Sequence, residues 1–183
     1  MKKVLILLLV LSLALLFSLQ SFSADKKYVG VKMCKACHNT EKQGKQFDIW
    51  QKSKHADAFK ALKTEAADKI AKQKGSDKPA AETPECLACH VTAHDVAATL
   101  KDKGFAMEDG IQCEACHGPG SEYKSMTIMK DKAKAVAAGL TDFKDDAAKE
   151  KLCKTCHNEK SPTYKEFKFK DMWAKIAHMR PKK

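Results

Sequence analysis

Apolar residues recur at helical intervals along several stretches of this chain, separated by breaks rich in glycine and proline. The clearest pattern runs from 46 to 73, where large apolar side chains return every three or four residues. The segment 75–84 then interrupts it with one glycine and two prolines. Similar patterns predict further helices over 90–101, 124–138, 142–157 and 167–179. Alternating strand patterns are almost absent, so we expect one mainly α domain with long loops and little or no β-structure.

The first residues follow a different pattern. Lys2 and Lys3 precede an almost unbroken apolar run from 4 to 17, and a polar stretch with small residues follows. This order is typical of a secretory signal peptide, and the run is shorter than the roughly 20 residues that span a bilayer. We predict cleavage after Ser23, so that residues 1–23 are the signal peptide and residues 24–183 form an exported, periplasmic domain without a membrane span. The alternative is an uncleaved anchor helix.

The eight cysteines form four pairs, each with two intervening residues and a histidine directly after it. The cysteines are Cys34, Cys37, Cys86, Cys89, Cys113, Cys116, Cys153 and Cys156, and the histidines are His38, His90, His117 and His157. Disulfides and zinc sites also use cysteine, but neither requires the same triplet four times. In c-type haem attachment both sulfurs bind one porphyrin as thioethers, and the adjacent histidine binds the iron. The sequence therefore predicts four covalently bound haem c groups.

Composition favours a fold built around these haems. Tryptophan and tyrosine are scarce, with two and three residues, and a domain with this much lysine and alanine has little side-chain core of its own. We therefore expect the chain without haem to be largely unfolded. The net charge of +11 would suit a nucleic-acid partner, but an exported protein meets little nucleic acid, and haem propionates offset much of the excess lysine. We expect no nucleic-acid partner.

Three histidines lie outside the motifs, namely His55, His94 and His178. Irons in c-type electron carriers commonly take His or Met as a second axial ligand, so all three are candidates. His94 follows His90 by four residues, so on the expected helix it must serve a different haem or none. Seven histidines cannot fill eight axial positions, so one haem uses Met, takes a ligand from a neighbouring molecule or stays five-coordinate. Met126 and Met129 are the candidate sulfur ligands.

Five segments around the motifs have a distinctive sequence: 28–38, 50–56, 85–92, 111–121 and 167–172 with His178. Together they resemble the cytochrome c-554 family of tetrahaem cytochromes, over nearly the whole exported chain. The resemblance implies a mostly helical fold with closely packed haem pairs, three haems with two histidine ligands each, and one open haem on the second motif. The best-known members accept electrons from hydroxylamine oxidoreductase in ammonia-oxidising bacteria.

The resemblance also implies distal ligands. His55 and His178 match distal histidines of the family. A third family histidine follows the Gly-Pro-Gly turn, where this chain has none and where Met126 and Thr127 are the nearest candidates. His94 is present instead, where the type member has no histidine. We therefore expect a rearranged ligand set, and the open haem of the family does not transfer directly.

The sequence favours a periplasmic protein that moves electrons through its four haems between redox-partner proteins. We expect a dehydrogenase or quinol-oxidising complex as donor, a terminal reductase as acceptor, no catalytic residues, and a monomer or weak oligomer. One alternative is a haem enzyme that reduces nitric oxide, hydroxylamine or nitrite at a five-coordinate haem. A second alternative is a subunit of an extracellular cytochrome filament.

We predict that mass spectrometry of the secreted protein gives a chain beginning near Ala24 plus four haem masses. All eight sulfurs become thioethers, so no thiol remains for alkylation. Treatment of the unfolded protein with a thiol-alkylating reagent checks this, and we expect no cysteine to be modified. Two or three haems, or any disulfide, would contradict this prediction.

Overall fold

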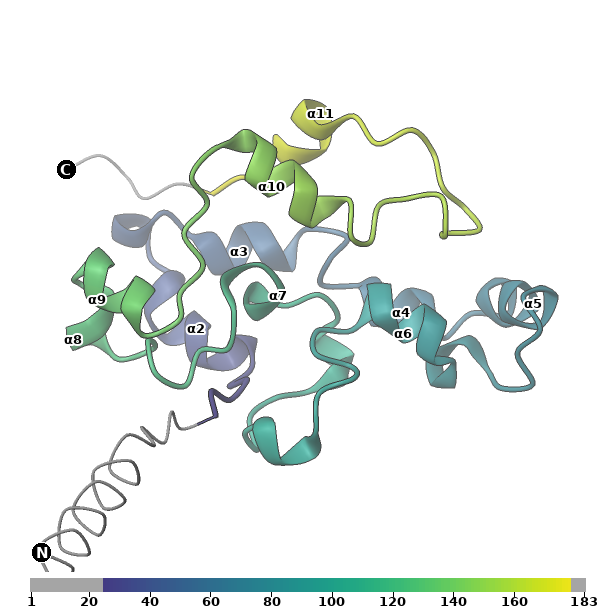
Figure 1. Cartoon of the computed structure of the whole chain (residues 1–183), viewed down its shortest axis with the longest axis horizontal. Helices are drawn as coiled ribbons and strands as arrows, with labels where there is room; N and C mark the ends of the chain where they lie inside the picture. Colours follow the sequence, from purple (N-terminus) through teal and green to yellow (C-terminus); the bar gives the residue numbers. More distant parts are fainter. Residues whose placement is uncertain (1–24, 179–183) are drawn as a thin grey trace, which may run out of the picture.

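The computed structural model describes residues 25–178, and the expected signal peptide lies outside them (Figure 1). Within this part of the chain the fold consists of ten α-helices and four 3-10 turns, with no β-strand. A single isolated bridge pairs Tyr28 with Lys101. The helical, loop-rich fold class predicted from the sequence is therefore confirmed.

The four motifs lie at the ends of helices. α2 (Val31–His38), α6 (Pro84–His90) and α7 (Cys113–His117) each end at a motif histidine. α10 (Asp146–Cys153) ends at the first cysteine of the fourth motif. The other helices are α3 (Gln46–Gln51), α4 (Ala58–Ala61), α5 (Glu65–Gln73), α8 (Met126–Met129), α9 (Lys132–Ala137) and α11 (Phe169–Trp173). The 3-10 turns are η1 (Glu41–Gln43), η2 (Ala80–Glu82), η3 (Ala98–Leu100) and η4 (Met107–Asp109).

The predicted long helix over 46–73 is wrong, because α3, α4 and α5 replace it. α3 ends where the Ser53 hydroxyl and amide both donate to the carbonyl of Trp50. α5 starts anew at Thr64, whose hydroxyl accepts the N–H of Ala67 at 3.2 Å. Hydroxyl groups that bond to nearby backbone offer the chain an alternative to a continuous helix. The turns between the helices leave His55 outside any helix.

The predicted helix over 90–101 is also wrong. α6 stops at His90, the next residue Val91 is extended with φ −137°, and Ala93 has φ +53°. A positive φ at a residue with a Cβ is incompatible with a right-handed helix. His90 and His94 therefore do not lie four residues apart on one helix. The expectation that His94 must serve a different haem from His90, or none, rested on that spacing and loses its basis.

The remaining helical predictions hold in part. Ser125 and Asp131 each cap a new helix, so 124–138 forms α8 and α9 separately. The predicted helices over 142–157 and 167–179 contract to α10 and α11, and Met179 lies outside the described residues. Short helices of this kind depend on tertiary contacts for their stability.

Side chains form only a small core. Its buried cluster comprises Phe59, Leu62, Ala71, Ala80 and Val91, so three of the five members are Ala or Val. The cluster lies between α4, α5, η2 and α6, which form one end of the molecule in Figure 1. α8 and α9 lie at the other end, and α7 lies near the middle. The middle of the molecule, where the motifs gather, has no comparable cluster among the described residues.

We expect Leu62→Ala to lower the free energy of unfolding of the haem-loaded protein by about 2–5 kcal/mol, because it removes a buried side chain from a small cluster. Val136→Ala, which shortens a side chain that is 36% exposed, is the matched control and should change stability little. Denaturant unfolding monitored by circular dichroism measures both variants. Equal effects would show that Leu62 does not belong to a core.

Candidate haem-binding sites

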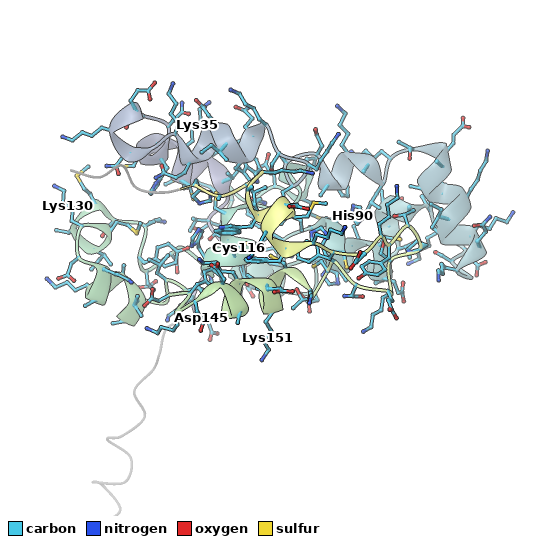
Figure 2. All side chains as sticks on the ribbon, turned by 90° about the horizontal axis from the view of Figure 1, so that it is seen from above. Lys35, His90, Cys116, Lys130, Asp145 and Lys151 are labelled. Atoms are coloured by element: carbon cyan, nitrogen blue, oxygen red, sulfur yellow. The ribbon has the colours of Figure 1, made fainter. Side chains whose placement is uncertain are left out.

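The eight motif cysteines are unbridged, and several of them lie close to cysteines of another motif. The Cys34 side chain interacts directly with Cys113, and the Cys89 side chain interacts with Cys156. Cys116 in turn lies within electrostatic range of Cys153 and Cys156. The motifs are therefore connected in space in the order first, third, fourth, second, which differs from their order in the chain. Figure 2 shows Cys116 inside the molecule and His90 of the second motif farther toward α5.

Two of the predicted distal histidines lie opposite motif histidines. The ring centroids of His55 and His157 are 6.0 Å apart, and those of His117 and His178 are also 6.0 Å apart. A histidine nitrogen binds a metal at about 2 Å and the ring centre lies about 1 Å beyond it, so two imidazoles on opposite sides of one iron have centroids about 6 Å apart. Both pairs therefore leave the space that one iron requires. The donor set fits c-type haem, with two cysteines and two imidazoles at each of these sites.

Burial favours the neutral form of three of these imidazoles, those of His117, His55 and His157, as metal ligation requires. Burial lowers the pKa of His117 to about 4, and nearby His178 and His38 add to the effect. Burial also lowers the pKa of His55, with a further contribution from His157. The pKa of His157 is lowered by burial as well. Each of these rings can offer a lone pair near neutral pH.

Hydrogen bonds orient several of the rings. The Nδ1 atom of His90 lies 2.6 Å from the carbonyl oxygen of Ala58, and that of His178 lies 3.0 Å from the carbonyl of Ile176. The Nδ1 atom of His38 lies 3.3 Å from Oε1 of Gln46. Ligating histidines commonly donate their second ring N–H to such acceptors, which leaves Nε2 for the metal.

The backbone around His55 is fixed by hydrogen bonds and a close approach that the sequence did not predict. The carbonyl of His55 accepts the N–H of Ile111 at 3.0 Å, and the carbonyl of Ile111 accepts the indole N–H of Trp50 at 2.7 Å. Gly110 has φ +64°, and a Cβ there would lie 2.6 Å from the His55 carbonyl oxygen. Only glycine suits this close approach. On the far side, Phe167 stacks on the His157 ring with centroids 4.9 Å apart.

The remaining candidate ligands are not brought into such pairs. The His94 side chain is 19% exposed, and its Nδ1 atom lies 3.8 Å from the carboxylate of Asp95. Met126 is 61% exposed at the start of α8, and Met129 ends the same helix. In residues 25–178, the ring contacts place no second histidine against His38 or His90. In the described residues, the rings of His178 and His55 therefore lie opposite the histidines of the third and fourth motifs, and no histidine ring lies opposite those of the first and second.

Four attachment motifs that gather on one small helical domain, two of them facing a second histidine, define a multihaem c-type cytochrome. The sequence profile of a family described as cytochrome c554 and c-prime matches residues 33–118. Cytochrome c-554 of Nitrosomonas europaea is 32% identical over 162 residues, which cover 79% of this chain and 64% of that relative. The chain thus spans just under two thirds of the length of this curated relative.

Structural comparison agrees with the sequence comparison. The reduced state of cytochrome c554 from Nitrosomonas europaea matches with a TM-score of 0.53 and 26% identity, covering 86% of each chain. All three comparisons support a tetrahaem cytochrome of the cytochrome c554 family, with four c-type haems. The resemblance and the cofactor predicted from the sequence are confirmed.

Proposed function

We propose that this protein is an electron carrier that passes electrons through its four haems between redox-partner proteins. The observation that carries the proposal is the contact between motifs, because Cys34 meets Cys113, Cys116 lies near Cys153, and Cys156 meets Cys89. Haems attached to these cysteines are held close together, so an electron can move between neighbours along the whole group. When bound, the haem irons supply the one-electron redox chemistry.

We assign axial ligands to two of the haems. His117 and His178 hold the third haem, and His157 and His55 hold the fourth. The 6.0 Å ring separations support both assignments. Two imidazoles close an iron to substrates and give it a lower potential than a His/Met pair, which suits electron transfer rather than catalysis. The chain's own part is to orient these rings and, by burial, to keep those of His55, His117 and His157 neutral.

A second candidate function is reduction of a small nitrogen compound at an open haem. The observation that favours it is the lack of a paired histidine at His38 and His90 in the described part of the chain. His90 is further fixed by the carbonyl of Ala58, which holds the ring without occupying the opposite side of an iron. His94 makes no ring contact with His38 or His90 in the described residues, and a Met126 or Met129 sulfur is the other group that could close such a site.

The proposed location is the periplasm. Residues 1–23 read as a removable signal peptide, and residues 24–183 form the tetrahaem domain. Among the described residues, none of the helices has the length and apolar character to cross a membrane. Covalent haem attachment to exported cysteines agrees with this location. The donor and acceptor would be a dehydrogenase or quinol-oxidising complex and a terminal reductase.

We expect His178→Ala to convert the third haem from low-spin to high-spin, and His55→Ala to do the same to the fourth. Each change removes one strong-field ligand from one iron and leaves the other irons as they are. Low-temperature electron paramagnetic resonance of the oxidised protein counts the signals directly. His94→Ala is the control and should leave both signals unchanged. An unchanged spectrum in either ligand variant would remove that histidine from the assignment.

We expect the reduced protein to bind carbon monoxide at one haem or more, because seven histidines cannot fill eight axial positions. Optical spectra with and without carbon monoxide measure the bound fraction. His55→Ala and His178→Ala should each add one further binding site, which calibrates the signal. Absence of binding together with a near-infrared sulfur-to-iron band would favour Met126 or Met129 as the missing ligand. A monomer with four two-histidine signals would contradict the count.

A further inference from the structure

Glu114 is a charged residue in an unusual place. It is the second residue of the third motif and is only 2% exposed. The equivalent residues in the other motifs are Lys35, Leu87 and Lys154, of which the two lysines are exposed and the leucine is partly buried. Burial of a carboxylate costs free energy unless hydrogen bonds compensate it, so a specific set of partners must hold it there.

Backbone amides provide these partners. The N–H of Val29 donates to both carboxylate oxygens at 2.8 and 3.1 Å, and the N–H of Gly30 donates at 2.8 Å. The N–H of Gly120 donates at 2.7 Å from the Gly-Pro-Gly turn. None of the ion pairs formed within residues 25–178 includes Glu114. The negative charge is therefore hydrogen-bonded but is not neutralised by a lysine.

The carboxylate joins two haem-bearing helices that are far apart in the chain. Val29 and Gly30 directly precede α2, which carries the first motif, while Glu114 lies in α7 of the third motif. Gln112 adds a parallel bond, because its Oε1 accepts the N–H of Val31 at 2.8 Å. These bonds bring α2 and α7 together where Cys34 meets Cys113.

We propose that Glu114 is a positioning residue that fixes the first haem against the third and, through its buried charge, lowers the reduction potentials of both. A fixed negative charge stabilises the ferric iron relative to the ferrous iron, and net charge, hydrogen bonding and burial are the factors by which proteins set such potentials. The second and fourth motifs make none of these bonds to Glu114, so the pair formed by the first and third haems is tuned separately. The proposal needs only the four haems, and it can be tested whether or not the electron-carrier role is correct.

The test is a redox titration of Glu114→Gln in the four-haem protein, with each haem assigned by nuclear magnetic resonance through contacts to its own motif. Glutamine keeps the size of the side chain and removes the charge. The potentials of the first and third haems should rise, while those of the second and fourth should stay near the parent values. Glu114→Asp keeps the charge and should stay closer to the parent than Glu114→Gln. Glu122→Gln removes an exposed carboxylate nearby and should change no potential.

Unchanged potentials in a four-haem Glu114→Gln protein would overturn the proposal, as would an equal rise in Glu122→Gln or a rise spread evenly over all four haems. The variant could also mature with fewer haems, because its amide group then faces backbone N–H donors. Peptide mapping decides that case. An empty first or third motif supports the positioning role, and an empty second or fourth motif contradicts it.

Discussion

Covalent attachment of haem to short Cys-X-X-Cys-His helices is the constraint on which the rest of this structure depends. Each attachment needs two sulfurs and one imidazole on about one turn of helix, and this chain of 183 residues carries four such turns. Few large apolar side chains remain, and the cluster around Phe59 and Leu62 serves only the α4–α6 end. Most of the interior that holds the other helices together must therefore be porphyrin.

This constraint also explains why the helices are short. Helices of four to nine residues, the lengths found here, are unstable by themselves and need a neighbour to pack against. α2, α7 and α10 have such a neighbour in the haem that each one carries or adjoins. Between these helices the chain turns. The turns occur where a hydroxyl side chain bonds to nearby backbone, as at Ser53, or where Gly110 adopts a positive φ without steric strain. The polar bonds of Glu114 and Gln112 take over the role that a hydrophobic core has in larger domains.

The sequence predicted the chemistry better than the path of the chain. The motif spacing was sufficient for the four haems, and apolar periodicity was sufficient for a helical fold. Periodicity failed over 46–73 because Ser53 and Thr64 bond to backbone locally, and it failed after His90 because Ala93 adopts a positive φ. Which histidine faces which motif could not be predicted, since His55 and His157 are a hundred residues apart in the chain. The burial of Glu114 could not be predicted for the same reason, because its hydrogen-bond donors Val29 and Gly30 lie far from it in the chain.

The order of the motifs in space has a consequence for how the protein is made. The first motif meets the third and the second meets the fourth, so the two contacting pairs are interleaved along the chain. Neither pair can form until the chain has been made as far as residue 113, and the last pair waits for residue 156. The chain therefore cannot be cut between the second and third motifs into two independent two-haem halves. The helices of the first two motifs therefore reach their packed arrangement only after the later half of the chain has been made.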